Sequence, residues 1–195
     1  QPLPRAGEDV AHLAGNLPDV PDHLLNLVGD DADHAGDGVL EGLPRLPDHL
    51  DQTPEEVQAV RERLGLDDQR YVAFLGALEP RKNVPALIRG FALACQRRQD
   101  SPALVLAGQP GWDTQVEQAL AEVPHRIRVI RAGYLPFRML SGFLGGADVV
   151  AYPSLGEGFG LPVLEAMACG AAVLTTRLLS LPEVGGDAVA YCGTT

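Results

Sequence analysis

Lysine is almost absent from this sequence of 195 residues, which contains 14 arginines but a single lysine, Lys82. Aromatic residues are also sparse, at 5% of the chain. No stretch approaches the ~20 consecutive apolar residues that a membrane-spanning helix needs, and the chain does not open with the charged-then-apolar pattern of a signal peptide. The lack of a long apolar run and of a signal-peptide pattern argues against an integral membrane protein and favours a cytoplasmic location.

Cysteine is also rare. The three cysteines are Cys95, Cys169 and Cys192, and no two of them form a CxxC pair. An odd number without such a pair is not typical of a disulfide framework. We therefore expect these residues to be reduced and buried, where they behave as small apolar side chains.

The net charge of −11 comes from the front of the chain. Residues 1–69 carry 16 acidic and 4 basic side chains, whereas the remainder is close to neutral. Binding of nucleic acid requires a basic face, and anchoring to anionic lipid requires clustered basic side chains. The charge pattern therefore argues against both kinds of partner.

Residues 1–52 are rich in Pro, Gly, Asp and His and show no sustained helical or strand period. We expect this segment to be poorly structured, as a linker or as the remnant of another domain. It includes the acidic cluster Asp30-Asp31-Ala32-Asp33, which we interpret as solvated charge rather than a metal site.

Regular structure is predicted from Thr53 onward. The sequence Thr53-Pro54-Glu55-Glu56 is a typical helix start, and Gly65 suits the C-terminal cap of that helix. Apolar spacing predicts further helices after an N-cap at Asn83, from about Asp113, over 136–145 and around 161–169. Short apolar runs predict strands at 71–76, 103–108, 127–133, 148–153, 172–176 and 189–193.

Strands and helices that alternate with short connections predict an α/β fold with a parallel sheet covered on both faces. Right-handed crossovers make this a Rossmann-like, doubly wound domain, which we assign to residues 53–195. Ligands of such sheets bind beyond the carboxyl ends of the strands. A binding site is therefore expected among the loops 76–83, 108–112, 133–136 and 153–160.

The loop GALEPRKN (76–83) has the composition of an anion site. Gly76 ends a strand and is expected to leave the backbone uncrowded, while Arg81 and Lys82 precede a helix N-terminus. Two cations beside free helical N–H groups attract anions, and a diphosphate is the natural guest. The alternative that both are ordinary solvated charges stays open from this loop alone, although the position of the single lysine favours a site.

The segment PSLGEGFGLPVLEAMACG (153–170) is a more specific motif. The glycines Gly156, Gly158 and Gly160 permit positive φ or close approach to backbone amides, and the helix start after them can hold negatively charged oxygens. A phosphate would repel Glu157 and Glu165. We therefore expect these carboxylates to accept hydrogen bonds from hydroxyls, Glu157 from a transferred sugar and Glu165 from a ribose. The alternative is a strand-turn-helix connection with two surface acids.

This segment resembles the E-x7-E signature of family 4 of the retaining glycosyltransferases, enzymes with the GT-B fold of two facing Rossmann-like domains. The resemblance runs from about residue 54 to the end. It includes GALEPRKN, AGYLP (132–136) and SLPEVGGDA (180–188). It implies that the chain is the C-terminal, donor-binding half of such an enzyme. Most of the acceptor half would be missing, and the domain itself would be truncated at its C-terminus.

The resemblance also implies a role for each matching residue. Arg81 and Lys82 would hold the donor diphosphate, Glu157 would lie near the donor sugar, and Glu165 would bind the ribose hydroxyls. The residues whose backbone amides would reach sugar or phosphate are Gly158, Phe159, Gly160 and Leu161. Tyr134 and Leu135 would contact the nucleobase, chiefly through their backbone.

The activity so implied is transfer of a sugar from a nucleoside-diphosphate-sugar with retention of configuration. No metal or other cofactor would be required, because Arg81, Lys82 and the helix N-terminus would stabilise the leaving diphosphate as a metal does elsewhere. The sequence agrees in offering no DxD motif between strand and loop. GDP-mannose and UDP-glucose both remain open as donors. The acceptor would be a saccharide or a lipid-linked saccharide, and the full-length enzyme could lie at the inner membrane face.

Other functions stay open. A GT-B epimerase or phosphorylase shares the architecture, and a glycoside hydrolase also places two carboxylates at a sugar, although it has little use for a phosphate site. A module that binds nucleotide-sugars without catalysis is the alternative of a different class. We expect this chain by itself to bind nucleoside diphosphate weakly and to transfer no detectable sugar.

Overall fold

The computed structural model describes residues 52–194. Except for Gln52, the segment predicted to be poorly structured therefore lies outside the described residues. Within residues 52–194, six strands form one parallel sheet in the order β3-β2-β1-β4-β5-β6. The strands are β1 (Tyr71–Leu75), β2 (Ala103–Ala107), β3 (Val129–Gly133), β4 (Val149–Tyr152), β5 (Val173–Thr176) and β6 (Ala190–Cys192).

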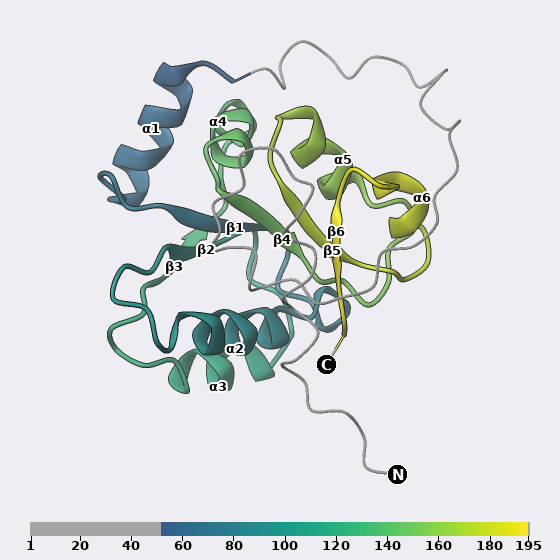
Figure 1. The fold of residues 1–195 in the computed structure, drawn as a ribbon, viewed down its shortest axis with the longest axis horizontal. Coiled ribbons are helices and arrows are strands. Elements are labelled where there is room, and N and C mark those ends of the chain that lie inside the picture. Colours follow the sequence, from purple (N-terminus) through teal and green to yellow (C-terminus); the bar gives the residue numbers. More distant parts are fainter. Residues whose placement is uncertain (1–51, 195) are drawn as a thin grey trace.

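Helices cover both faces of the sheet. The α-helices are α1 (Pro54–Leu64), α2 (Val84–Cys95), α3 (Gln115–Ala121), α4 (Leu140–Gly145), α5 (Leu161–Ala168) and α6 (Leu181–Gly185), and the 3-10 turns are η4 (Pro80–Lys82) and η5 (Phe137–Met139). Figure 1 shows α2 and α3 on one face, with α1, α4 and α5 on the other. The predicted Rossmann-like, doubly wound α/β fold is confirmed.

The strand order has one reversal, between β1 and β4. The chain runs outward from β1 through β2 to β3, returns to pair β4 with β1, and then continues outward through β5 and β6. The strand order therefore reverses between β1 and β4, and in doubly wound sheets ligands bind in the crevice beyond the carboxyl ends of the strands at such a point. The loops that follow β1 and β4, 76–83 and 153–160, are the ones that carry the predicted motifs.

The first helix shows how closely local sequence signals can specify an element. Thr53 Oγ1 accepts from the amide of Glu56 at 3.2 Å, and the Glu56 carboxylate accepts from the amide of Thr53 at 3.0 Å, which completes a capping box. Gly65 ends the helix in the left-handed region, with φ of 60°. Both predicted ends of α1 are therefore confirmed.

Other local predictions need correction. Asn83 occupies the N-cap position of α2, but its side chain does not cap the helix; its Nδ2 instead donates to the carbonyl of Thr194 at 3.3 Å. The region 136–145 divides into η5 and α4. The short helix α6 was not predicted, because its five residues are too few to show a period. Cys95 and Cys169 are buried free thiols, whereas Cys192 is only partly buried.

Within the described part of the chain, no helix combines the length and the apolar character needed to cross a membrane. The sheet is instead held by an apolar core. Its central strands are almost completely buried, with burial of every residue in β2 and β4. The large side chains that this core encloses include Tyr71, Phe74, Phe143 and Tyr152.

The loop after β1 is held against the loop after β2 by two glycines. A Cβ on Gly108, whose φ is 140°, would lie 2.0 Å from the carbonyl oxygen of Gly76, and a Cβ on Gly111 would lie 2.0 Å from that of Leu78. The amide of Leu78 also donates to the carbonyl of Gln109 at 3.2 Å. The backbone at Gly76 is therefore crowded on its β2 side, contrary to expectation, and this contact fixes the path of the loop.

Replacing Gly108 by alanine should destabilise the fold, because the new methyl group collides with backbone that cannot move without shifting the loop. We expect the free energy of unfolding to fall by about 3 kcal/mol. Gly90→Ala is the matched control, because its Cβ in the middle of α2 meets nothing within 4 Å. It should stabilise by about 0.5–1 kcal/mol. Denaturant unfolding measures both, and equal effects would contradict the argument.

Candidate functional site

The two motif loops are joined to each other at the crevice. The amide of Leu155 donates to the carbonyl of Arg81 at 2.7 Å, and Ser154 Oγ lies 2.9 Å from the same oxygen. The β4 loop is held from its other side by Thr176, whose hydroxyl donates to the carbonyl of Ser154 at 2.6 Å. Residues 70 or more positions apart in the sequence are thereby placed in one site.

The centre of this site is the carboxylate of Glu157, which bridges two cations from the other loop. Lys82 Nζ lies 2.6 Å from Glu157 Oε1, and Arg81 Nη1 lies 2.8 Å from Glu157 Oε2. Ser154 Oγ is 2.6 Å from Oε1 as well. The side chains of Lys82 and Glu157 are only 7% and 8% exposed, so this pair is almost shielded from water.

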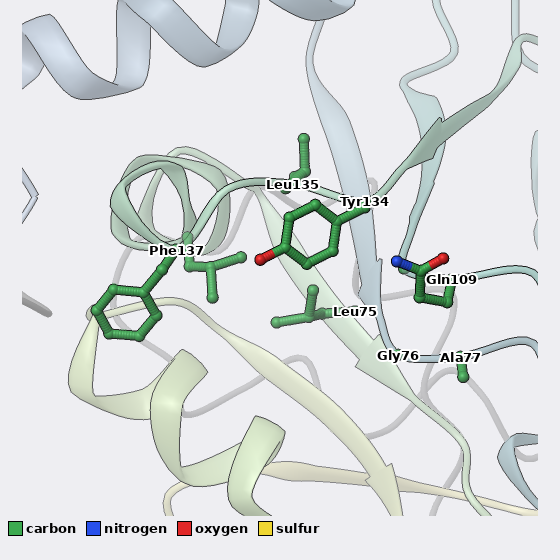
Figure 2. Close-up of a pocket in the computed structure, with 9 residues that line it drawn as sticks. Leu75, Gly76, Ala77, Gln109, Tyr134, Leu135 and Phe137 are labelled. Carbon is green, nitrogen blue, oxygen red and sulfur yellow. The ribbon is translucent and has the colours of Figure 1, made fainter.

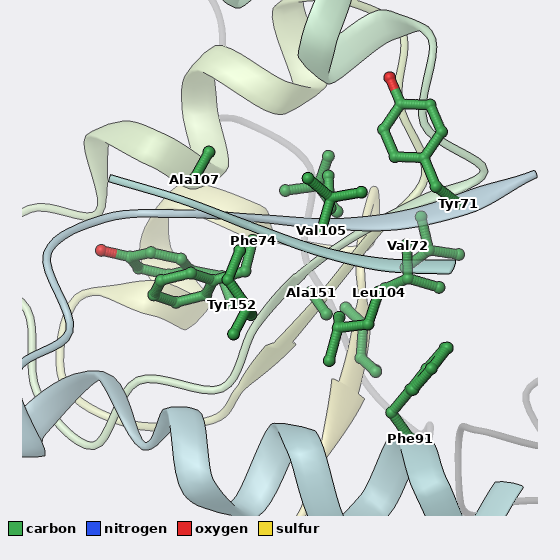
Figure 3. Close-up of a cluster of buried hydrophobic side chains, with 14 of the residues drawn as sticks. Tyr71, Val72, Phe74, Phe91, Leu104, Val105, Ala107, Ala151 and Tyr152 are labelled. Atoms are coloured by element: carbon green, nitrogen blue, oxygen red, sulfur yellow. The ribbon is translucent and has the colours of Figure 1, made fainter. Parts of the chain in front are cut away.

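The burial of Lys82 excludes the alternative that it is an ordinary solvated charge. Its ammonium lies 4.6 Å from the centre of the Tyr152 ring and also hydrogen-bonds the Tyr152 hydroxyl, which lies 3.1 Å from Glu157 Oε1. Figure 3 shows the Tyr152 ring beside that of Phe74, and their centroids are 6.0 Å apart. Tyr152 is thus a rigid support that directs the lysine toward the carboxyl edge of the sheet.

Arg81 is held differently. Its side chain is 49% exposed, and besides Glu157 it pairs through Nε with Glu79 Oε2 at 2.8 Å. Its Nη1 also donates to the carbonyl of Gly156 at 3.2 Å. The hydrogen bond and charge of Glu157 raise the pKa of the guanidinium, which stays charged at every accessible pH.

The pKa values of the two central groups, Glu157 and Tyr152, shift in opposite directions. Burial alone would raise the pKa of the Glu157 carboxyl, but hydrogen bonds to its charged form from Lys82, Ser154 and Arg81 outweigh burial. The pKa of Glu157 therefore lies below the ordinary glutamate value. Burial first, and then the neighbouring Glu157 charge, raise the pKa of the Tyr152 hydroxyl, so Tyr152 stays neutral.

A hollow of about 230 Å³ lies beside this cluster, between the ends of β1, β2 and β3. Figure 2 shows the Tyr134 ring over Leu75 at its rim, with Gln109 and Phe137 to either side. Tyr134 is 62% exposed and Phe137 60%, whereas Leu135 is 3% exposed and packs into the core. The hollow therefore offers apolar side chains and exposed aromatic rings to a ligand.

The glycine-rich turn before α5 borders the crevice from the β4 side. Gly160 has φ of 97°, which requires glycine, whereas a Cβ at Gly158 would meet nothing within 4 Å. Phe159 and Leu161 are 49% and 56% exposed at this turn, where α5 begins. The amides of Val163 and Leu164 both donate to the Gly160 carbonyl, at 3.0 and 3.3 Å. Glu165 lies in the middle of α5 and is partly buried. The functions predicted for these residues stay predictions.

Among residues 52–194, no group of three or more His, Cys, Asp or Glu side chains could hold a metal ion. Arg81 and Lys82 bring cationic groups to the crevice, where each is paired with a carboxylate. The prediction that no metal takes part in the reaction is not tested by this finding.

Sequence reasoning brought the correct loops together but missed several side chains of the site. Neither Tyr152 nor Glu79 was assigned a function, although Tyr152 directly precedes the motif 153–170 and Glu79 lies within GALEPRKN. Their position in the sequence contained a signal, because Tyr152 ends a buried strand and Glu79 precedes Pro80 in the loop that carries both cations. The close contact of Gly108 with the Gly76 carbonyl was also missed, since it depends on the pairing of β2 with β1.

Comparison with known proteins identifies the family. The family Glycosyl transferases group 1 matches residues 56–194. The O-antigen chain mannosyltransferase B of Escherichia coli is 39% identical over 142 residues, which cover 72% of this chain and 37% of that protein. A D-inositol 3-phosphate glycosyltransferase of Mycolicibacterium gilvum is 32% identical over 161 residues, which cover 80% of this chain and 36% of that protein.

Solved structures give the same fold. HepE of Anabaena in complex with UDP matches with a TM-score of 0.59 and 24% identity, over 69% of this chain and 37% of that one. WaaG, a glycosyltransferase involved in lipopolysaccharide biosynthesis, matches with a TM-score of 0.59 and 22% identity, over 74% of this chain and 40% of that one.

The fold is thus that of the C-terminal domain of a GT-B glycosyltransferase. The chain belongs to the family Glycosyl transferases group 1, and it spans little more than a third of the two relatives described above.

Removing the Tyr152 hydroxyl should weaken the cluster without disturbing the stacked rings. We expect Tyr152→Phe to lose about 2 kcal/mol of unfolding free energy, because its hydroxyl bonds two charged groups. Tyr71→Phe is the matched control, since that buried hydroxyl donates to a neutral carbonyl, that of Phe143, at 2.7 Å. It should lose about 1 kcal/mol. A control loss equal to or larger than that of Tyr152→Phe would contradict this view of the cluster.

The low pKa of Glu157 predicts a pH-dependent stability. Because the folded protein holds the Glu157 proton less tightly than the unfolded chain, the stabilisation is complete above the ordinary glutamate pKa and is lost as the pH falls through the folded value. We expect Glu157→Gln to be less stable by about 3 kcal/mol near neutral pH, since Lys82 loses its counter-ion.

The difference in stability between wild type and Glu157→Gln should shrink as the solution is acidified. Denaturant unfolding of both proteins at a series of pH values measures it. A difference that stays constant down to the most acidic pH at which both proteins fold would rule out the proposed ionised state of Glu157.

Proposed function

We propose that this domain binds the donor in an enzyme that transfers a sugar from a nucleoside-diphosphate-sugar with retention of configuration. The observation that carries the proposal is the convergence of Arg81, Lys82 and Glu157 at the crevice where the strand order reverses. Membership of the glycosyltransferase family supports it. The acceptor would be a saccharide or a lipid-linked saccharide, bound by a second domain.

The geometry supports one orientation of the bound donor, with its nucleobase in the hollow and its diphosphate at the two cations. The nucleobase would enter the hollow at Tyr134 and Leu135, where an apolar surface and exposed rings suit a planar ring system. Glu165 would accept hydrogen bonds from the ribose hydroxyls. The diphosphate would then lie at Arg81 and Lys82, between the hollow and the glycine-rich turn.

The transferred sugar would lie beyond the diphosphate, near the carboxylate of Glu157. The backbone around it would be that of Gly158, Phe159, Gly160 and Leu161, and the open space at Gly158 leaves room for a ligand to approach this turn. Gly76, at the end of β1, also lines the hollow, and its lack of a side chain would let the phosphates come close to the loop backbone on the side away from Gly108.

The two cations would stabilise the same leaving group with different geometries. Breaking the bond between the anomeric carbon and the phosphate oxygen leaves a nucleoside diphosphate with growing negative charge, which Arg81 and Lys82 would stabilise. Arginine offers a bidentate fork, and the buried lysine offers a fixed point charge. Together they would replace a metal ion, so we propose that the reaction needs none.

The identity of the donor is suggested by the relatives. The similarity to mannosyltransferases of Escherichia coli favours a donor that carries mannose, such as GDP-mannose. UDP-glucose is the second candidate, because a structural neighbour, HepE of Anabaena, was solved with it. The location of the whole protein in the cytoplasm, or at the inner membrane face, stays a prediction.

Calorimetric titration of the chain with GDP, UDP and ADP tests the proposal. We expect weak binding with a preference for one base, and we expect Lys82→Ala to weaken binding of all three about a hundredfold, since a fixed charge at the diphosphate is lost. Arg89→Ala is the matched control, because Arg89 also pairs with a glutamate, Glu122, but lies on α2 away from the crevice. It should leave the affinity unchanged.

Several results would contradict the proposal. Failure of the wild-type chain to bind any of these nucleotides would remove the donor site. Release of free sugar from a nucleotide-sugar without an acceptor would favour a hydrolase, and isomerised donor would favour an epimerase. We also expect no detectable transfer by this chain alone, because the domain that would bind the acceptor is not among its described residues.

A further inference from the structure

We propose that Glu79 sets the affinity of the donor site by competing with the donor's diphosphate for Arg81. This inference rests on the proposed function, because it takes Arg81 as a ligand of the diphosphate. It concerns a residue outside the E-x7-E motif, and it predicts that removing a charged side chain tightens binding.

Each of the two bidentate edges of the Arg81 guanidinium already holds an acceptor of the chain itself. Its Nε pairs with Glu79 Oε2 at 2.8 Å, and its Nη1 contacts both Glu157 Oε2 at 2.8 Å and the carbonyl of Gly156 at 3.2 Å. A guanidinium has five N–H donors in a rigid fork, and two of its edges are used here. A diphosphate can take the bidentate position only if a carboxylate gives up its place.

The charges of the site also cancel. The cations Arg81 and Lys82 face the carboxylates Glu79 and Glu157, so these four side chains together carry no net charge. An incoming diphosphate therefore meets no net charge from these four groups, and it must take the place of a carboxylate to bond Arg81 in a bidentate way. Binding becomes an exchange of one anion for another, in which the strength of the internal pair lowers the apparent affinity.

Exposure indicates which cation takes part in the exchange. The side chain of Lys82 is 7% exposed and fixed by Tyr152, whereas that of Arg81 is 49% exposed. Arg81 is therefore the group that can turn toward a ligand. Glu157 keeps the neighbouring Lys82 and Ser154 when Arg81 turns, whereas in the described part of the chain the side chain of Glu79 is bonded to Arg81.

Glu79 cannot move far from the site after it releases Arg81. Its amide donates to the carbonyl of Ala77 at 2.8 Å, and its own carbonyl accepts from the amide of Lys82 at 2.9 Å. Pro80 restricts the backbone of Glu79 to the extended region that it occupies, with φ of −100° and ψ of 148°. The carboxylate thus stays near the diphosphate and repels it, which adds to the competition.

The test compares Glu79→Gln with the control Glu122→Gln. Glutamine keeps the size of the side chain and loses its charge. Glu122 pairs with Arg89 Nε at 2.7 Å, the same contact type as the one between Glu79 and Arg81, but on the outer surface of the domain. Calorimetry on the whole chain would measure the affinity for inorganic pyrophosphate, GDP, UDP, guanosine and uridine at low and high salt.

We expect Glu79→Gln to bind pyrophosphate and the nucleoside diphosphates about three- to tenfold more tightly than wild type, because a competing partner and a nearby like charge are both removed. The affinity for guanosine and uridine should not change. The gain should shrink at high salt, since the interaction is partly screened. Glu122→Gln should match wild type with every probe.

The outcomes separate this inference from the proposed function. Unchanged or weaker binding by Glu79→Gln would overturn the inference, and weaker binding would mean that Glu79 orients Arg81 for the diphosphate. A tightening that also extends to the nucleosides, or that Glu122→Gln reproduces, would overturn it as well. If neither wild type nor Glu79→Gln binds pyrophosphate or a nucleoside diphosphate, the proposed function itself fails.

Discussion

The bridge from Glu157 to Lys82 and Arg81 is the interaction on which this site depends. It joins the loop after β1 to the loop after β4 at distances of 2.6 and 2.8 Å. A buried lysine and a buried carboxylate are each costly in isolation, and they become tolerable when they are paired and hydrogen-bonded. The stacked, buried ring of Tyr152 supplies the remaining partner, so the hydrophobic core and the charged cluster support each other.

In the proposed function, the same bridge would connect stability with binding. The two cations of the site, Arg81 and Lys82, are compensated by carboxylates of the chain itself, Glu79 and Glu157. Under the proposed function, the more firmly these acids hold the cations, the better the site is ordered and the more strongly the acids compete with a diphosphate. The two cations differ in freedom: the half-exposed side chain of Arg81 can turn toward a ligand, whereas the buried side chain of Lys82 is fixed.

Much of the fold could be predicted from local patterns, because each depends on neighbours in the sequence. The capping box at Thr53 and the apolar stripe of α2 are signals of that kind, and both helices are present. The prediction failed where distant contacts decide. Asn83 has the chemistry of an N-cap, but its amide bonds Thr194 instead, and α6 is too short to show a period.

The sequence by itself determined that the chain is a parallel α/β domain. It also determined that one loop carries the cations Arg81 and Lys82 and that a second segment, 153–170, carries Glu157 and Glu165, because residue type and spacing are local properties. Only the tertiary structure decided that Arg81 and Lys82 lie against Glu157, since that contact depends on β4 pairing with β1 rather than with β3. Strand order is a balance of packing over the whole sheet, and no single segment encodes it. The parts that Tyr152 and Glu79 take in the cluster follow from that order.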